Sequence, residues 1–120
     1  DATLHKALSF WAAIDKADPA QVDAAIDVMA LGPLACVPVR MLSTGQRKRA
    51  MLARTIASGA AIWLLDEPGN GLDAASLELL GYAVERHLAN GGISLVASHQ
   101  PLSIPAPVTI HLPDHQVAPE

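Results

Sequence analysis

The stretch Ile62-Trp63-Leu64-Leu65-Asp66-Glu67-Pro68 places four large apolar residues directly before two adjacent carboxylates and a proline. An apolar run this short is typical of a strand buried on both faces, inside a parallel sheet covered by helices. Ligands of open α/β sheets bind beyond the carboxyl ends of the strands, so we expect Asp66 and Glu67 at the rim, side by side but pointing to opposite faces. One carboxylate can hold a metal ion while the other orients a water, as phosphoryl transfer requires. A plain strand followed by an acidic turn is the alternative.

Length and composition indicate a single globular domain with a real core, since 51% of the 120 residues are hydrophobic. A net charge of -4 with eight Lys and Arg argues against nucleic acid as a main partner. The longest apolar stretch, near Ala60 to Leu65, ends at Asp66, well short of the roughly 18 residues of a spanning helix. The single Cys36 fits a reducing compartment. Because the sequence opens at Asp1 without a methionine, we expect an N-terminal part to precede it.

The first 41 residues have the periodicity of two short helices. Apolar residues recur at helical spacing in two groups, Leu4, Leu8, Trp11 and Ala12, then Val22, Ala25, Ile26 and Met29. Asp18-Pro19 is a start signal between them, and Gly32-Pro33 is expected to end the second helix. Residues 36–40 are expected to form an extended connector. Trp11 lies on the apolar stripe and is therefore expected in the core.

The stretch Leu42-Ser43-Thr44-Gly45-Gln46-Arg47-Lys48-Arg49 introduces a helix that we expect to run to about Ser58. Ser43 and Gln46 have the spacing of a capping box, which is a purely structural explanation. Three cations crowd the first turn, where the helix dipole disfavours them. An anion at the N–H groups of Ser43 to Gly45 would make this positive charge useful, and Gly45 would then allow close approach of the backbone.

A second strand is expected to follow the first through a helical crossover. Residues 69–73 have the composition of a turn, a helix is expected from Ala74 to Asn90, and Asn90-Gly91-Gly92 ends it. The apolar stripe of this helix comprises Leu77, Leu80, Val84 and Leu88. A buried strand over residues 93–98 would then run parallel to the first and bring His99 to the same rim as the carboxylates. Residues 108–112 form a further candidate strand, and His111 and His115 lack the spacing of metal ligands.

These stretches resemble the motifs of ABC-type ATPases, in the family's order and spacing. Leu42 to Gln46 is similar to the signature motif, Ile62 to Glu67 to the Walker B strand, Gly69 to Asp73 to the D-loop, and His99 to the switch histidine. Within the superfamily, the chain is most similar to the ATP-binding subunits of haem exporters of cytochrome c maturation. That narrower resemblance rests on Phe10-Trp11-Ala12, Val37-Pro38-Val39-Arg40, Gly91-Gly92-Ile93 and His99-Gln100-Pro101-Leu102.

The resemblance implies a P-loop NTPase-like α/β fold with a RecA-like core, in which a mainly parallel sheet is flanked by helices, and an N-terminal helical segment. Residues 1–41 would belong to the helical subdomain, and residues 42–120 to the signature helix and the C-terminal half of the ATPase core. The sequence contains no G-x-x-x-x-G-K-(S/T) loop, because none of its lysines, Lys6, Lys16 and Lys48, follows a glycine. The family's glutamine loop is missing too. We therefore expect a C-terminal part of a subunit nearly twice as long.

The family's catalytic roles transfer onto three residues of this sequence. Asp66 would help to hold Mg²⁺, Glu67 would polarise the water that attacks the γ-phosphate of ATP, and His99 would contact that phosphate. These roles come from the resemblance alone.

The remaining site residues would serve the nucleotide bound on the opposite subunit of a head-to-tail dimer. Ser43, Thr44, Gly45 and Gln46 would face its γ-phosphate, and Asp73 with its loop would cross the same interface. Two departures from the family pattern affect these roles. Thr44 stands where a second glycine is most common, and Gly69-Asn70-Gly71 is looser than the usual triplet of small residues.

The function implied is that of the ATP-hydrolysing subunit of an ABC transporter, coupling hydrolysis to export or release of haem. Such a subunit would lie peripherally at the cytoplasmic face of the inner membrane, with membrane-spanning partners contacting residues 1–41. A truncated ABC-like module that binds a partner and hydrolyses nothing is one alternative. A soluble ABC ATPase acting on DNA or ribosomes is another, against which the acidic balance counts. Fold and motor chemistry do not specify a cargo, so haem rests on the resemblance alone.

Overall fold

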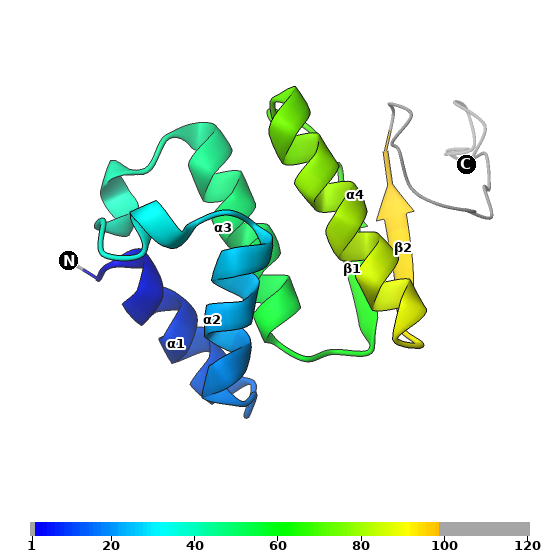
Figure 1. Ribbon diagram of the computed structural model, residues 1–120, viewed down its shortest axis with the longest axis horizontal. Coiled ribbons are helices and arrows are strands. Elements are labelled where there is room, and N and C mark those ends of the chain that lie inside the picture. Colours follow the sequence, from blue (N-terminus) through cyan, green and yellow to red (C-terminus); the bar gives the residue numbers. More distant parts are fainter. Residues whose placement is uncertain (1, 99–120) are drawn as a thin grey trace, which may run out of the picture.

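The computed structural model describes residues 2–98, which form four α-helices and two strands (Figure 1). In chain order they are α1 (Leu4–Ile14), α2 (Pro19–Val28), the 3-10 turns η1 (Gly32–Leu34) and η2 (Val39–Met41), α3 (Thr44–Ala57), β1 (Ile62–Asp66), α4 (Ala74–Ala89) and β2 (Ile93–Ala97). The candidate strand over residues 108–112 lies outside the described residues. Every helix and strand expected within residues 2–98 is confirmed.

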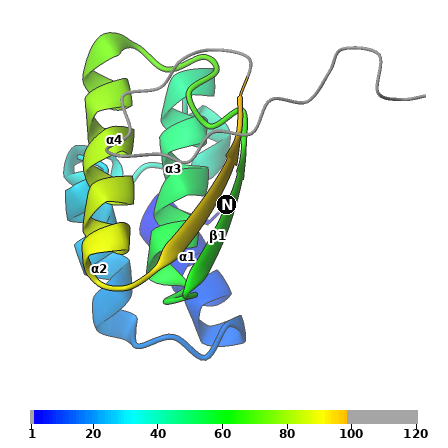
Figure 2. The ribbon, with the colours of Figure 1, turned by 90° about the vertical axis from the view of Figure 1, so that its right-hand side faces the viewer.

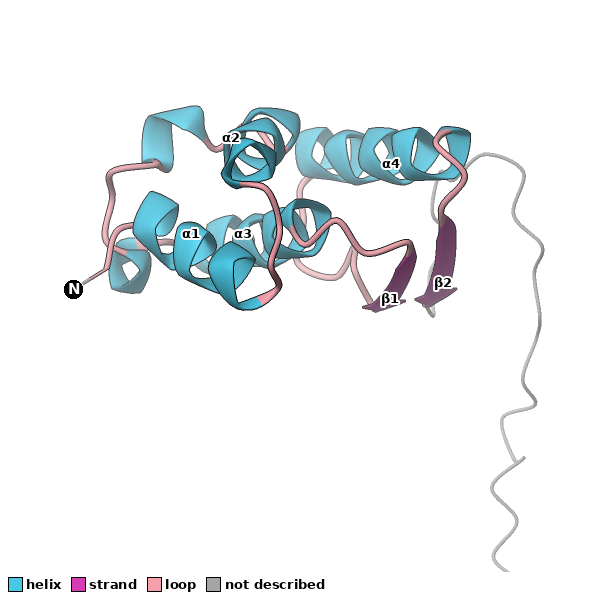
Figure 3. Ribbon diagram, turned by 90° about the horizontal axis from the view of Figure 1, so that it is seen from below, coloured by secondary structure: helices cyan, strands magenta, loops and turns pink. Residues whose placement is uncertain are grey.

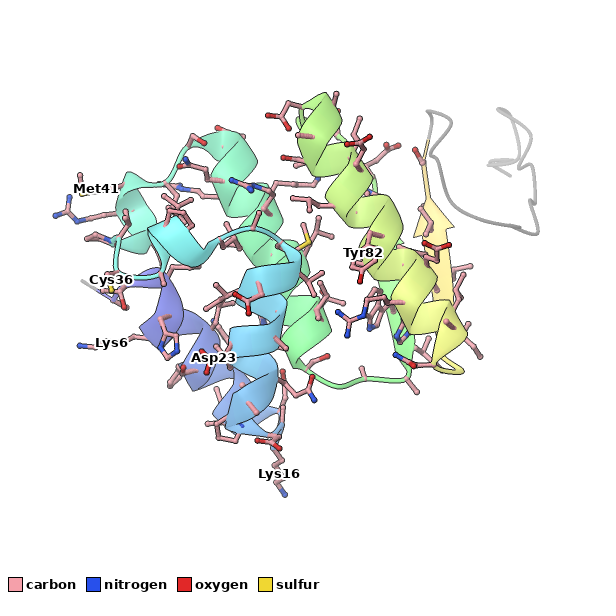
Figure 4. The ribbon with its side chains drawn as sticks, in the orientation of Figure 1. Lys6, Lys16, Asp23, Cys36, Met41 and Tyr82 are labelled. Carbon is pink, nitrogen blue, oxygen red and sulfur yellow. The ribbon has the colours of Figure 1, made fainter. Side chains whose placement is uncertain are left out.

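The N-terminal helices begin where local capping chemistry places them. Thr3 caps α1, and Asp18 caps α2 by accepting the N–H of Ala20 at 2.9 Å, with Pro19 at the first helical position. Asp23 of α2, labelled in Figure 4, lies 3.2 Å from Nε2 of His5 on α1. Figure 3 shows α1 and α2 beside α3, to one side of the two strands.

The connection from α2 to α3 differs from the sequence prediction. Helix α2 ends at Val28, ahead of Gly32-Pro33, and Ala30 then adopts a positive φ of 54°. Residues 36–40 do not form a continuous extended connector. The 3-10 turn η2, in which Met41 N–H donates to Pro38 O at 2.9 Å, and an isolated antiparallel bridge between Pro38 and Thr3 replace it. The bridge satisfies backbone groups on both sides of Pro38, because Leu4 N–H donates to Val37 O at 2.9 Å and Val39 N–H donates to Ala2 O at 3.1 Å.

The prediction that Trp11 lies in the core is wrong. Its side chain is 37% exposed, and the guanidinium carbon of Arg54 lies 3.7 Å from the ring centroid. The buried stripe of α1 consists of Leu4, Leu8 and Ala12, which follow each other at intervals of one helical turn. Trp11 stands beside this stripe, where a cation–π contact covers one face of the indole.

Strands β1 and β2 are parallel neighbours, as expected, with Ile62 opposite Ile93 and Asp66 opposite Ala97. Figure 2 shows both strands edge-on, with α3 and α4 on the same side of them. On that face Trp63 and Leu65 are buried. The intervening Ile62 and Leu64 are 58% and 72% exposed.

The expectation of a sheet buried on both faces is therefore wrong for the described part of the chain. Strand β2 repeats the pattern, because Ile93 and Leu95 are 59% and 64% exposed. The physical reason is that the helices of residues 2–98 pack on one face of the strand pair. The apolar runs were correctly identified as strands, while their burial depends on what packs against them from elsewhere.

Helix α4 connects the two strands and ends at Ala89, with Asn90 as its C-cap, one residue before the predicted end. Its buried face comprises Ser76, Leu80, Ala83 and Val84, whereas Leu88 in the last turn is 38% exposed. One continuous core extends from α1 through α3 to β1 and α4, so the division at residue 41 stays a prediction. No helix between residues 2 and 98 combines the length and apolar character needed to cross a bilayer.

Candidate functional site

The carboxyl ends of β1 and β2 and the N-terminal ends of α3 and α4 lie at the same end of the molecule (Figure 1). The residues predicted to carry the chemistry stand at these termini: 43–46 at the start of α3, 66 and 67 at the end of β1, and 73 at the start of α4. The fold therefore brings them to one end. His99 lies outside the described residues.

The start of α3 is an ordered capping box, as the spacing predicted. Ser43 Oγ accepts the backbone N–H of Gln46 at 3.1 Å, and Gln46 Oε1 accepts the backbone N–H of Ser43 at 2.8 Å. Both side chains thus have a structural role in this chain. A hydroxyl can donate its own hydrogen while it accepts another, so Ser43 can still donate to an anion at this terminus.

The two carboxylates differ in backbone conformation. Strand β1 ends at the exposed Asp66, and Glu67 is half-buried with φ of 47°. The alternation of a strand does not extend to Glu67, so the expectation that the two side chains point to opposite faces loses its basis. Residues with a side chain rarely adopt positive φ, and Glu67 also precedes Pro68, a position that favours extended backbone.

Glu67 is held by its backbone on both sides. Its N–H donates to Ala97 O of β2 at 2.7 Å, and its carbonyl accepts the N–H of Asn70 at 3.1 Å. Lys48 Nζ of α3 donates to the same carbonyl at 2.8 Å. The candidate general base is therefore tied to a strand, to a turn and to the helix that begins at Ser43.

The loop after Glu67 packs against the start of α3. A Cβ added to Gly45 would lie 3.5 Å from Gly71 O, which is an ordinary van der Waals contact. Gly71 itself has φ of 81°, a conformation that favours glycine. The described chain therefore requires glycine at 71 for its backbone, whereas it gives no steric reason for glycine at 45.

Asp73 caps α4, accepting the N–H of Ser76 on its Oδ1 at 2.8 Å. The side-chain hydrogen bond with Ser76, followed by the bond to its backbone, holds the pKa of Asp73 below the usual range, and the positive charge of Arg49 acts in the same direction. A carboxylate at a helix N-terminus also interacts favourably with the helix dipole. The predicted contact of Asp73 with a second subunit is thus additional to a structural role.

The three cations near the start of α3 have backbone acceptors that could not be read from the sequence, and only Arg47 of them stands in the first turn. Arg47 donates to Arg40 O at 2.8 Å, and Lys48 donates to Glu67 O. Arg49 donates to Met29 O at 3.1 Å, at the C-terminal end of α2, where the dipole favours a cation. Their crowding was the available signal. These backbone contacts account for the three cations without an anion.

Within residues 2–98 no three His, Cys, Asp or Glu side chains group closely enough to enclose a metal ion. This does not conflict with the expected Mg²⁺, which is commonly held by one or two carboxylates together with phosphate oxygens and waters. The exposed Asp66 at the end of β1 fits such a half-site.

A cavity of about 340 Å³ lies at the other end of the strands. Trp63, Arg86, His87 and Gly92 are among the residues that line it, and none of the predicted site residues does. We therefore place the candidate site at the carboxyl end of the strands, where the polar groups gather, rather than in this cavity.

Comparison with known proteins gives independent information. The model of the ABC transporter family matches residues 2–70. The cytochrome c biogenesis ATP-binding export protein CcmA of Sphingopyxis alaskensis is 59% identical over 102 residues, covering 85% of this chain and 53% of that protein. ABC transporter I family member 1 of Arabidopsis thaliana is 45% identical over 100 residues, covering 83% of this chain and 42% of that protein. The chain spans about half the length of the curated relatives it matches.

Solved structures agree on the fold. A bacterial ABC transporter cassette, solved as a dimer, superposes with a TM-score of 0.73 at 21% identity, over 82% of this chain and 47% of that one. CbiO1 of Clostridium perfringens, part of the ABC transporter complex cbiONQ, gives a TM-score of 0.65 at 29% identity, over 82% of this chain and 41% of that one. The helices and parallel strand pair thus match part of a P-loop NTPase cassette, as expected.

Proposed function

The chain belongs to the ABC transporter family, and from this membership we propose that it forms the signature-bearing part of an ATPase subunit that drives a transporter of cytochrome c biogenesis. Haem is the proposed cargo, exported or released at the expense of ATP. The identity to proteins named as ATP-binding export proteins of cytochrome c biogenesis supports this assignment. The observation that carries the chemistry is the position of Asp66 and Glu67 at the end of β1, beside the start of α3.

We assign a different role in ATP hydrolysis to each of three residues. Asp66 would hold Mg²⁺, which supplies charge neutralisation at the phosphates. Glu67 would accept a proton from, or orient, the attacking water, and its backbone is already fixed by three hydrogen bonds. His99 would contact the γ-phosphate from the same edge of the sheet.

The start of α3 would bind ATP held by a second subunit. Ser43 can donate its hydroxyl hydrogen, and the backbone N–H groups of Thr44 and Gly45 lie at a helix N-terminus that favours anions. Gln46 would hold Ser43 in place through the capping box, and Asp73 would lie at the same interface. We propose a head-to-tail dimer on these grounds, attached to membrane-spanning subunits at the cytoplasmic face of the inner membrane.

A non-catalytic module is the competing function, favoured by the absence of a glycine-lysine phosphate loop from the 120 residues. In that case Glu67 would be a structural residue. The two functions predict different effects of removing the charge of Glu67.

Replacement of Glu67 in the complete ATPase subunit tests the proposal. Glu67→Gln should retain ATP binding and lose most turnover, by roughly 100-fold or more, because it keeps size and hydrogen bonding but removes the charge that activates water. Binding is measured by calorimetric titration with Mg-ATP and turnover by phosphate release. Equal losses of affinity and turnover would show that Glu67 is structural.

A further inference from the structure

Lys48 makes a contact that has no role in the proposed reaction. Its Nζ donates to the backbone carbonyl of Glu67 at 2.8 Å, in a part-buried position. Hydrogen bonds from an ionised donor are shorter and stronger than those between neutral groups. A lysine in the second turn of α3 therefore binds the main chain of the candidate general base.

The backbone of Glu67 needs such support. Its φ of 47° lies in a region that residues with a side chain seldom occupy, and such conformations persist only where the surroundings fix them. Of its backbone contacts, the bond to Ala97 O ties it to β2 and the bond from Asn70 closes the local turn. The bond from Lys48 joins it to α3.

We propose that Lys48 is a positioning residue for Glu67, and that it couples the start of α3 to the hydrolytic carboxylate. This inference rests on the proposed function. Helix α3 begins at the capping box of Ser43 and Gln46, which is expected to face ATP on the partner subunit, whereas Glu67 would act on ATP of its own subunit. The bond from Lys48 thus joins the helix whose N-terminus would face the partner's nucleotide to the backbone of the residue that would act on the subunit's own nucleotide.

Neighbouring cations provide a matched comparison. Arg47 is the neighbouring residue of α3 and also donates to a carbonyl, but its acceptor is Arg40 O instead of Glu67 O. Replacing Arg47 therefore removes a positive charge near the start of α3 without removing the bond to Glu67.

The test uses the complete subunit with Lys48→Met, Lys48→Arg and Arg47→Met. Lys48→Met should lower kcat by about tenfold or more with KM and ATP affinity unchanged, since small misplacement of a catalytic group is costly. Lys48→Arg keeps a charged donor and should recover most of the rate. Arg47→Met should leave kcat within about twofold of wild type, because its bond does not reach Glu67.

A double-mutant cycle with Glu67→Gln separates positioning from general stabilisation. If Lys48 acts through the Glu67 carboxylate, Lys48→Met should cause no further loss of the residual turnover in the Glu67→Gln background. Multiplied losses in the double variant, or a wild-type kcat in Lys48→Met, would overturn the inference. Thermal unfolding checks each variant, and Lys48→Gln replaces Lys48→Met in the same comparisons if the latter does not fold.

The outcomes for the two proposals are distinct. A subunit in which Glu67→Gln hydrolyses ATP at the wild-type rate would overturn the proposed function and this inference with it. An inactive Glu67→Gln together with a fully active Lys48→Met would overturn the role of Lys48 alone.

Discussion

Ser43 and Gln46 satisfy each other's backbone N–H groups, so the residues expected to meet ATP are held in place before any ligand arrives. This matters for a contact made across a subunit interface, because a site that is already ordered loses less conformational entropy on binding. Gly45, by contrast, has no steric reason within residues 2–98 to lack a side chain. The small size of Gly45 leaves room for the proposed nucleotide of the partner subunit to approach the backbone.

The first prediction concerns Gly45 in the complete subunit. Gly45→Trp should abolish turnover with little change in the ATP affinity of the monomer, because the phosphate contact is made across the dimer. Gly45→Ala is the folding control, since its Cβ would make an ordinary contact with Gly71 O. Titration below the dimerisation concentration and a phosphate-release assay measure the two quantities. A matching loss of monomer affinity would contradict the prediction.

Asp73 gives a prediction about pH. Its folded-state pKa is lowered, so it contributes stability that is present above its unfolded pKa and is lost as pH falls through the folded value. Asp73→Asn keeps a capping oxygen but removes the charge. The unfolding midpoint of the wild-type subunit should therefore exceed that of Asp73→Asn at neutral pH, and the difference should shrink below about pH 4. A difference independent of pH would mean that the charge is not responsible.

Helices and strands were predictable from local signals, whereas their burial was not. Asp18-Pro19, the capping box of Ser43 and Gln46, and Asn90-Gly91-Gly92 mark boundaries through hydrogen bonds that neighbouring residues make. The burial of Trp11 and Leu64 depends instead on distant packing.

The candidate site was likewise predictable only in part. Its residues were identified from their order in the chain, and the parallel pairing of the strands followed from the crossover. The positive φ of Glu67 and the bond from Lys48 could not be predicted, because they depend on how α3 packs beside the end of β1.

At the opposite end of the strands, contacts of His87 hold α4 against β1 and β2. Its ring stacks on Trp63 with centroids 3.8 Å apart, and its Nε2 lies 2.9 Å from Ala61 O and 3.2 Å from Ile93 O. Because both partners are carbonyl oxygens, Nε2 carries the proton. Gly92 lies against this ring, so close that an added Cβ would stand 2.3 Å from the His87 Cε1.

Gly92→Ala should therefore destabilise the complete subunit by about 1–3 kcal/mol, through displacement of the His87 ring. Gly32→Ala is the matched control, because Gly32 has open space and no positive φ, and it should be nearly neutral. Thermal or urea unfolding measures both. Adding His87→Ala removes the clash, so the double variant should lose less than the sum of the single losses, and strict additivity would contradict this explanation.

At the scale of the whole described chain, residues 2–98, the main feature is a face of the strand pair that none of the four helices covers. By strand alternation and register, the face opposite Trp63 and Leu65 carries four apolar residues that are each more than half exposed: Ile62, Leu64, Ile93 and Leu95. Adjacent apolar side chains of this size on a strand pair promote association with other surfaces. Relatives about twice as long have further chain that can cover such a face.

The last prediction concerns the 120-residue chain by itself. In P-loop NTPases, backbone N–H groups of a glycine loop and its lysine surround the β- and γ-phosphates, and the sequence contains no such loop. Asp66 and Glu67 repel a polyanion unless a metal ion intervenes. We therefore expect the isolated polypeptide to be marginally stable and prone to association, to show no measurable ATPase activity, and to bind Mg-ATP no better than pyrophosphate.

Calorimetric titration with Mg-ATP and with pyrophosphate, combined with phosphate release and sedimentation of the purified chain, measures these properties. Leu64→Thr together with Leu95→Thr should reduce the association without producing activity. The exposed apolar face causes the association, whereas the lack of a phosphate loop accounts for the lack of activity. Micromolar binding of Mg-ATP accompanied by steady turnover would contradict the prediction. It would mean that residues 1–120 form a phosphate site of their own, and the carboxylates at the end of β1 would then act within a single chain.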